Sequence, residues 1–332
     1  MTLIKTTSAV GHVLCHDITQ IVPGEYKDAR FRKGHIVTPE DIPVLLSMGK
    51  EYLYIWEKKS GMLHEEEAAE ILCGLAQGVN IKKGDVKEGK IELFAECDGL
   101  LKVRSHTLFS VNSLDGVIVA TRRGNESIKK GAKVAGLKVV PLIIEESILE
   151  KARSVCSADL GHDKKLLDLL PFSHKRVGLI VTGNEVYHKR IPDKFSPVII
   201  EKLSAYDAEI VDTVILDDDH KRITEACLNM IEKQCDLVIC TGGMSVDPDD
   251  KTPLAIKNTG AEIISYGAPV LPGGMTLLSY YHKDSHKIPV IGIPACVMYY
   301  KKTIFDILLA RVMADDEISK DELAMLGEGG LL

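Results

Sequence analysis

The sequence is poor in aromatic residues, and its acidic residues outnumber its basic ones. Phe, Trp and Tyr make up 5% of the 332 residues, with a single Trp, and 41 Lys and Arg stand against 48 Asp and Glu, a formal net charge of −7. Binding to a nucleic-acid backbone requires a basic face, and binding to unpaired bases requires exposed aromatic rings. This composition argues against a general nucleic-acid binder, although it leaves room for a local basic pocket.

Long apolar runs and paired cysteine motifs are also missing. No run approaches the roughly 18–20 residues that span a bilayer, and the opening MTLIKTTSAVGHVLCHD lacks the apolar core of a secretory signal. The eight cysteines are scattered without a CxxC pair, which fits a reducing compartment better than a disulfide framework. We therefore expect a cytoplasmic protein with no membrane partner.

The length predicts about two domains, and the character of the sequence changes between residues 155 and 175. Before that point, two expected helices (38–48 and 64–76) interrupt short runs of alternating β-branched residues with turn glycines, at 51–57, 89–103, 115–124 and 133–144. We expect a β-rich α+β region over residues 1–155, in one or two subdomains, and a linker over 156–174. The segment 145–170 is predicted as two polar helices broken near Gly161.

From residue 175 onward, apolar strands alternate with helices. Strands are expected at 175–183, 208–216, 236–243 and 287–294, and helices at 197–206, 220–233, 253–258 and 297–313. Continuous apolar strands that alternate with helices predict a mainly parallel sheet covered on both faces. The fold class expected for residues 175–332 is therefore α/β.

Small and polar residues follow three of these strands, and ligands of open α/β sheets bind at that edge. The three endings are TGNE at 182–185, DDDH at 217–220 and TGGMSVDPDD at 241–250. Paired glycines with exposed N–H groups suit phosphate or another anion, and carboxylates share such a place when a hard cation such as Mg²⁺ bridges them. The pattern predicts a phosphate-bearing ligand and a divalent metal. The alternative is that Gly-Gly is only a turn and that the aspartates cap the helix near His220.

VTGNEV (181–186) and TGGMSVDPDD (241–250), with LDDDH (216–220) between them, resemble the paired signatures of the molybdopterin-binding MoeA/MogA superfamily. The resemblance covers about residues 175–312. It implies a three-layer α/β/α domain that binds molybdopterin, a pterin with a phosphate and a dithiolene. MoeA-type members insert molybdenum from molybdate into adenylylated molybdopterin and release AMP with the help of Mg²⁺. The resemblance thus implies a molybdopterin molybdenumtransferase, a homodimer or homotrimer, with molybdoenzymes as possible clients.

The resemblance also implies roles for individual residues. Glu185 matches the acid of the TG-(D/N)-E signature, Asp217 the acid that opens the second strand-end loop, with Asp218 as an alternative, and Asp250 the aspartate after the glycine loop. Glu185, Asp217 and Asp250 are the implied catalytic residues, and Asp217 and Asp250 the implied ligands of Mg²⁺. The implied pterin-binding positions, with Ser245 and the glycine amides on the phosphate, are Thr182, Gly183, Thr241, Gly242, Gly243, Ser245 and Pro294.

Three turns depart from the MoeA pattern. The PGKP-like segment is Pro272-Gly273-Gly274-Met275 without its lysine, the PGNP-like turn is GIPAC at 292–296, and Asp247 replaces a glycine after Ser245. These changes remove a cation and alter two phosphate-facing turns. They leave two alternatives open: a non-catalytic molybdopterin carrier or chaperone, and a CinA-like protein that processes pyrophosphate or nicotinamide nucleotides, which PDDKTP (248–253) favours.

The N-terminal region is similar to MoeA in VGHVLCHDI (10–18), FRKGHIVTPEDIPVLLSMG (31–49) and NSLDG (112–116). The last segment makes Asp115 a candidate site residue, although Val117 replaces the family's tyrosine and the order of the segments differs. Five further residues are metal ligands by type, but their surroundings favour structural or solvent-exposed positions: His12, Cys15, His16, His282 and His286. Cys296 could touch a metal or a thiolate ligand, but it is expected to be a packed residue at the start of a helix.

Overall fold

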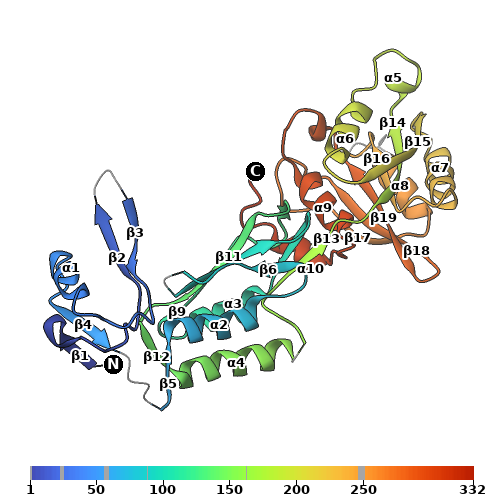
Figure 1. Cartoon of the computed structure of the whole chain (residues 1–332). Helices are drawn as coiled ribbons and strands as arrows, with labels where there is room; N and C mark the ends of the chain where they lie inside the picture. Colours follow the sequence, from blue (N-terminus) through green and yellow to red (C-terminus); the bar gives the residue numbers. More distant parts are fainter. Residues whose placement is uncertain (1, 23–25, 56–59, 88, 162, 246–250) are drawn as a thin grey trace. The chain divides into compact units, whose positions relative to one another are not determined.

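The computed structural model describes the chain except residues 1, 23–25, 56–59, 88, 162 and 246–250, and it divides into two compact units (Figure 1). The first unit contains residues 1–97, 102–124 and 129–169, and the second contains residues 98–101, 125–128 and 170–332. In place of the expected linker over 156–174, helix α4 (Glu146–Leu160) continues to Leu160, and strand β13 (Leu167–Pro171) replaces the second polar helix.

The first unit begins with short elements around a small apolar core. Strand β1 (Thr2–Lys5) pairs antiparallel with β4 (Tyr52–Ile55), and β2 (Ile18–Val22) pairs with β3 (Tyr26–Phe31). The short 3-10 turn η1 (Thr6–Ser8) and helix α1 (Asp41–Ser47) lie between them in sequence. The core residues include Leu14, Ile18, Phe31, Leu45 and Leu53.

A four-stranded antiparallel sheet forms the larger part of this unit. Its order is β6 (Ile81–Lys83), β7 (Lys90–Ala95), β11 (Lys133–Val139), β9 (Val117–Thr121). The helices α2 (Glu65–Ala76) and α3 (Ser105–Asn112) pack on this sheet, α4 packs on α2 and α3, and β5 (Met62–His64) pairs with β12 (Ile143–Glu145). A further sheet has the order β10 (Ser127–Ile128), β8 (Gly99–Val103), β13. The predicted α+β character of the N-terminal region is present in these elements.

The second unit is built on a six-stranded sheet. Its order is β15 (Ala208–Leu216), β14 (Lys175–Thr182), β16 (Leu237–Thr241), β19 (His286–Ile293), β18 (Leu277–Lys283), β17 (Glu262–Tyr266). The first four strands run parallel, as the sequence predicts, whereas β18 and β17 are antiparallel additions that the sequence does not predict.

Alternate residues of β14 point to opposite faces of this sheet, and each face carries its own core. Val177, Leu179 and Val181 pack on one face with helices α6 (Phe195–Leu203) and α9 (Ile304–Met313). Ile180 packs on the other face with α7 (His220–Glu232) and α8 (Thr252–Asn258). This is the three-layer α/β/α arrangement. The short helices α5 (Asn184–Tyr187), η2 (Ala295–Met298) and α10 (Lys320–Met325) complete the unit.

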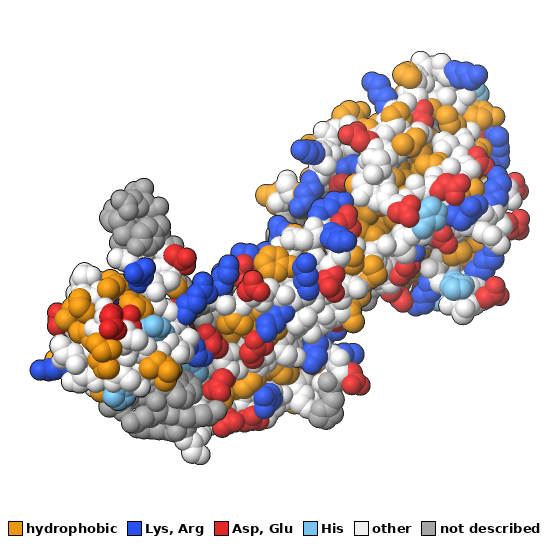
Figure 2. Space-filling model, viewed as in Figure 1, with side chains coloured by type: hydrophobic (Ala, Val, Ile, Leu, Met, Phe, Trp, Pro, Cys, Tyr) orange, Lys and Arg blue, Asp and Glu red, His pale blue; other side chains and the backbone are white. Residues whose placement is uncertain are grey.

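Two general expectations are met. All eight cysteines are free thiols, and among the described residues no helix is both long and apolar enough to cross a membrane. On the side of the molecule drawn in Figure 2, acidic and basic side chains of the described residues lie next to one another. They form no continuous basic face there of the kind that nucleic-acid binding requires.

Candidate functional site

The carboxyl ends of four parallel strands bring most of the predicted site residues to one edge of the sheet. Thr182 of β14 pairs with Leu216 at the end of β15, so Asp217 follows directly beside it. Thr241 ends β16 and pairs with Ile293 at the end of β19, which places Pro294 at the same edge. Segments that lie 25 to 110 residues apart in the sequence therefore meet where open α/β sheets bind ligands.

The glycine loop after β16 lies tightly against β14. Gly242 and Gly243 have φ angles of +93° and +54°, and a Cβ atom on Gly242 would lie 2.1 Å from the carbonyl oxygen of Thr182. The Thr252 hydroxyl donates to the Gly242 carbonyl at 2.8 Å and lies 3.1 Å from the Thr182 hydroxyl. Only glycine allows this approach, so the Gly-Gly pair is more than a surface turn.

The next two residues of this loop, Met244 and Ser245, are held by the edge strand β17. The Tyr266 hydroxyl of β17 donates to the carbonyl oxygens of Met244 and Ser245, each at 3.2 Å. Thr241, fully buried at the start of the loop, has a hydroxyl with no hydrogen-bond partner among the described residues. Asp250 and Asp247 lie in segment 246–250, outside the described residues.

The three consecutive aspartates after β15 have three different partners. Asp219 caps α7 by accepting hydrogen bonds from the amides of Lys221 and Arg222, and these bonds lower its pKa. Asp218 accepts from the Asn184 amide at 3.1 Å. The helix-cap alternative is thus correct for Asp219, while Asp217 is engaged elsewhere.

Asp217 forms an ion pair with a residue that the sequence analysis did not single out. Its Oδ2 lies 2.8 Å from Nη1 of Arg222, whose guanidinium carbon lies 5.2 Å from the centroid of the Tyr187 ring. Both terminal nitrogens of Arg222 are 3.4 Å from the Tyr187 hydroxyl, and the Tyr187 contact, followed by the charge of Asp217, raises the arginine pKa. The sequence does contain a signal for this partner, because Arg222 lies in the first turn of the helix that follows the acidic loop.

The other oxygen of Asp217, Oδ1, is buried and has no hydrogen-bond partner among the described residues. An unpaired carboxylate oxygen is the kind of ligand that Mg²⁺ prefers, and Mg²⁺ sites commonly use one or two carboxylates with ligand phosphates and water. Within the described ranges, no group of three or more His, Cys, Asp or Glu side chains could hold a metal ion. The described residues therefore offer one oxygen ligand that fits Mg²⁺, and Asp250, the second predicted ligand, lies outside them.

The remaining candidates of the second unit differ in how they fit this edge. Glu185 is exposed on α5, close to Gly183, whose φ angle is +141°. Cys296 is half-buried in η2, and burial raises the pKa of its thiol, which favours the expected packed role over a thiolate. His282, near the turn between β18 and β19, pairs with Glu262 of β17 at 2.9 Å.

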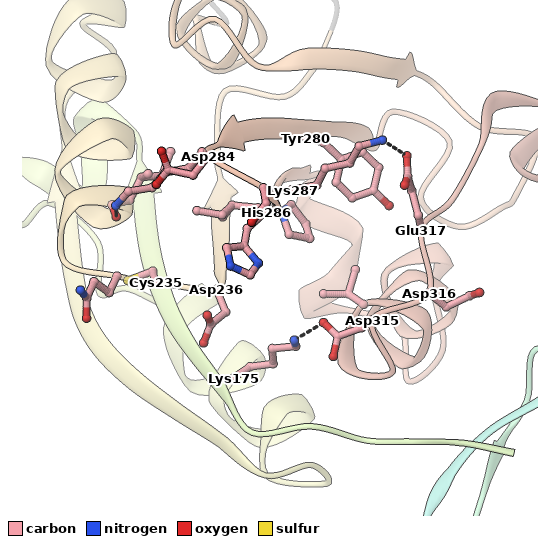
Figure 3. A pocket seen from close by; sticks show the side chains of 17 residues that line it. Lys175, Cys235, Asp236, Tyr280, Asp284, His286, Lys287, Asp315, Asp316 and Glu317 are labelled. Atoms are coloured by element: carbon pink, nitrogen blue, oxygen red, sulfur yellow. Dashed lines mark hydrogen bonds and ion pairs between the residues drawn. The ribbon is translucent and has the colours of Figure 1, made fainter. Parts of the chain in front are cut away.

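Two cavities lie at the two ends of the parallel strands. One of about 510 Å³ lies at the carboxyl edge and is lined by Asn184 and residues 217–221. A larger one of about 640 Å³ lies at the opposite edge, beside the first residues of β14 and β19 (Figure 3). There Lys175 pairs with Asp315 and Lys287 with Glu317, so these charges compensate one another within the wall. The carboxyl edge remains the candidate site.

The first unit holds the other predicted positions. Asp115 is exposed in the turn between α3 and β9 and stays a prediction. The Cys15 thiol is buried and donates to the Tyr54 carbonyl at 2.9 Å, and it lies 3.4 Å from Nδ1 of His16. Burial raises the pKa of Cys15 and lowers that of His16, so both side chains are neutral and structural, as expected.

Comparison with known proteins gives two family matches. Residues 178–314 match a family described as a probable molybdopterin binding domain, and residues 3–57 match a domain of unknown function, DUF8806. A CinA-like protein of Mycobacterium marinum is 31% identical over 90 residues, and one of Mycobacterium tuberculosis is 29% identical over 90 residues. Each match covers 27% of this chain and 21% of the relative, so the chain matches about a fifth of the length of these curated relatives.

Two of the similar solved structures match this chain over most of their own length. The tungsten cofactor synthesizing protein MoaB from Pyrococcus furiosus is 19% identical, with a TM-score of 0.33, over 43% of this chain and 89% of that chain. The CinA protein from Thermoplasma acidophilum is 18% identical, with a TM-score of 0.33, over 44% of this chain and 99% of that chain.

Proposed function

We propose that the second unit binds molybdopterin at the carboxyl edge of its sheet and acts in molybdenum cofactor biosynthesis, because residues 178–314 match a probable molybdopterin binding domain. The reaction we propose is insertion of molybdenum from molybdate into adenylylated molybdopterin, with release of AMP. The observation that carries the proposal is that the Gly242–Gly243 loop and the unpaired Oδ1 of Asp217 lie at this same edge, on either side of the end of β14.

The chemistry of each group of residues suits it to one role in this reaction. The amides of the glycine loop and the Ser245 hydroxyl are donors suited to the pterin phosphate, which Thr182, Gly183, Thr241 and Pro294 enclose. Oδ1 of Asp217, with Asp250, would hold Mg²⁺, which when bound neutralises charge that develops on the phosphates. Glu185, exposed on α5, is the third proposed catalytic residue. Positioning and electrostatic stabilisation by these groups supply the catalysis.

The test is a reconstitution assay with the full chain. Purified protein is incubated with adenylylated molybdopterin, molybdate and Mg²⁺, and AMP release and activation of a molybdoenzyme lacking its cofactor are measured. We expect both. Binding of the pterin without AMP release would favour the carrier, and no binding of the pterin would overturn both proposals.

A single substitution separates catalysis from binding. Asp250→Ala is expected to abolish AMP release and to leave pterin binding and the circular dichroism spectrum unchanged, because this carboxylate is expected at a loop and is the proposed second ligand of Mg²⁺. Unchanged AMP release in this variant would show that Asp250 has no catalytic role.

A CinA-like activity is the second candidate, and one observation favours it. The curated relatives with sequence similarity are CinA-like proteins, and Thr252, which follows the Asp249-Asp250 pair, anchors the glycine loop through the Gly242 carbonyl. This candidate predicts cleavage of the pyrophosphate bond of a nicotinamide dinucleotide without molybdate, which chromatography of the products would detect. The proposal also includes a cytoplasmic location, assembly as a homodimer or homotrimer, and molybdoenzymes as clients.

A further inference from the structure

The site needs a cation for the ligand phosphate, and the turn expected to provide it has none. Pro272-Gly273-Gly274 lacks the lysine of the MoeA pattern. The 510 Å³ cavity is lined by Asp217, Asp218 and Asp219, whose charges oppose an anionic ligand. Phosphate binding in such surroundings requires a fixed positive group close by, because backbone amides carry only partial charges.

Arg222 does not line this cavity itself, but it is paired with Asp217, which does, and it is positioned to be that group. The Asp219 cap fixes the first turn of α7, and Arg222 is the third residue of this helix. Its guanidinium is held in place by Oδ2 of Asp217 at 2.8 Å and by the face of the Tyr187 ring. A cation above an aromatic ring and beside a carboxylate loses little conformational freedom when it binds a second anion.

The guanidinium also has the capacity for a second anion. It carries five N–H donors in a planar fork, the contact with Asp217 uses Nη1 only, and 42% of the Arg222 side chain is exposed. Through this pair Arg222 neutralises part of the negative charge of the acidic loop, so the same arginine links the acidic loop to an incoming phosphate.

We propose that Arg222 donates hydrogen bonds to a phosphate oxygen of the ligand, and that Asp217 and Tyr187 are the residues that position its guanidinium. The identity of the ligand rests on the proposed function, whereas the binding of a phosphate group by Arg222 does not. Adenylylated molybdopterin and nicotinamide dinucleotides share a pyrophosphate group, and this group is the part that Arg222 recognises. Since the guanidinium charge is permanent, this contact does not depend on Mg²⁺.

Titration of inorganic pyrophosphate into the full chain in EDTA, followed by calorimetry, tests the proposal. We expect wild-type protein to bind, Arg222→Gln to bind at least about tenfold more weakly, and Arg222→Lys to give an intermediate loss, since it keeps the charge and loses the fork. The matched control is Arg176→Gln, which removes a similarly exposed arginine at the start of β14 from its pair with Glu209. It is expected to bind as wild type does.

The positioning role has its own readout. Tyr187→Leu removes the ring and is expected to weaken pyrophosphate binding, whereas Tyr187→Phe retains the ring and is expected to restore it. Thermal unfolding of each variant verifies that the second unit remains folded. Absence of pyrophosphate binding by the wild type in EDTA, or equal binding by wild type and Arg222→Gln, overturns the proposal.

A parallel titration with adenylylated molybdopterin, which carries the pyrophosphate group, separates this inference from the proposed function. If pyrophosphate binds in an Arg222-dependent way and adenylylated molybdopterin does not bind, the proposed function fails and the inference stands. If adenylylated molybdopterin binds equally to wild type and to Arg222→Gln, the inference fails and the proposed function stands.

Discussion

The closest backbone approach in the site is between Gly242 and Thr182, and it is testable at the scale of one residue. Gly242→Ala would place Cβ 2.1 Å from the Thr182 carbonyl oxygen at a φ angle of +93°. We expect it to destabilise the second unit by more than about 3 kcal/mol, since the collision adds to backbone strain of roughly 1–3 kcal/mol. Urea unfolding followed by circular dichroism measures this loss.

Gly260→Ala is the matched control for that substitution. Gly260 lies in the same unit with a φ angle of +85°, but a Cβ atom there meets nothing within 4 Å. It isolates the conformational strain, so we expect a loss of about 1 kcal/mol. Equal losses in the two variants would mean that the glycine loop can move away from β14.

The sequence identified the types of residue at the site better than their partners. It predicted that Asp217 to Asp219 are functional or helix-capping; the structure shows Asp219 as the cap, and the functional role of Asp217 stays a prediction. It did not identify Arg222 and Tyr187, because the contacts of Arg222 with Asp217 and with Tyr187 depend on how α5 and α7 start relative to the strand ends. Such partners follow from tertiary geometry and not from spacing within one motif.

At the scale of elements, the N-cap of α7 links helix stability to ligand binding. Asp219→Ala removes hydrogen bonds to the amides of Lys221 and Arg222. We expect a loss of about 1 kcal/mol of stability, and a weaker affinity for pyrophosphate because the turn that carries Arg222 loosens. Asp219→Asn keeps the cap and should retain both properties. A full loss of binding in Asp219→Asn would indicate that the charge, not the cap, is required.

The N-cap of α2 makes the first unit sensitive to acid. Nε2 of His64 lies 2.6 Å from the Cys15 carbonyl oxygen, which can only accept, so Nδ1 is the acceptor for the Lys33 ammonium and the Glu66 amide. Burial, followed by the charge of Lys33, lowers the pKa of this buried imidazole. The folded state therefore holds His64 neutral where the unfolded state takes up a proton.

It follows that stability is unaffected by His64 above the ordinary histidine pKa of about 6.5 and decreases below it, by up to about 1.4 kcal/mol per pH unit. His64→Asn keeps a good N-cap and should flatten the decrease, leaving the contribution of His16, whose pKa is also lowered. Denaturant unfolding at pH 7, 6 and 5 measures the difference. Parallel pH profiles for the two proteins would contradict this role.

The sequence predicted those helices and strands whose own residues carry the full pattern of apolar and capping positions. The parallel strands were recognised from their apolar runs, and α2 from its length and acidic first turn. The helix expected over 297–313 is divided into η2 and α9, because Thr303 and Asp306 form a capping box that starts a new helix. That signal was present in the sequence. Strand β17 was missed because its half-buried edge position weakens the pattern by which strands are recognised. Strand β18 lies between β17 and β19 and is buried at Leu277 to Tyr280, but its apolar run is short and ends in polar residues.

At the scale of the whole molecule, the second unit includes pieces of chain that a linear division at residue 175 assigns to the N-terminal region. Leu100 is fully buried and packs in this unit with Ala310 and Ala314. Leu100→Ala should therefore lower the stability of the second unit by about 2–5 kcal/mol. Limited proteolysis with mass spectrometry, which identifies the unit that opens, measures the effect. Opening of the first unit alone would contradict the assignment.

The central claim is that the ligand binds at the carboxyl edge of the sheet. Titration of molybdopterin into two variants with the same substitution tests it most directly: Ser245→Asp at this edge, and Ser285→Asp in the wall of the larger cavity at the opposite edge. Ser245→Asp places a negative charge in the glycine loop and should abolish binding, whereas Ser285→Asp should bind as wild type does. Loss of binding in Ser285→Asp, with binding intact in Ser245→Asp, would contradict the account.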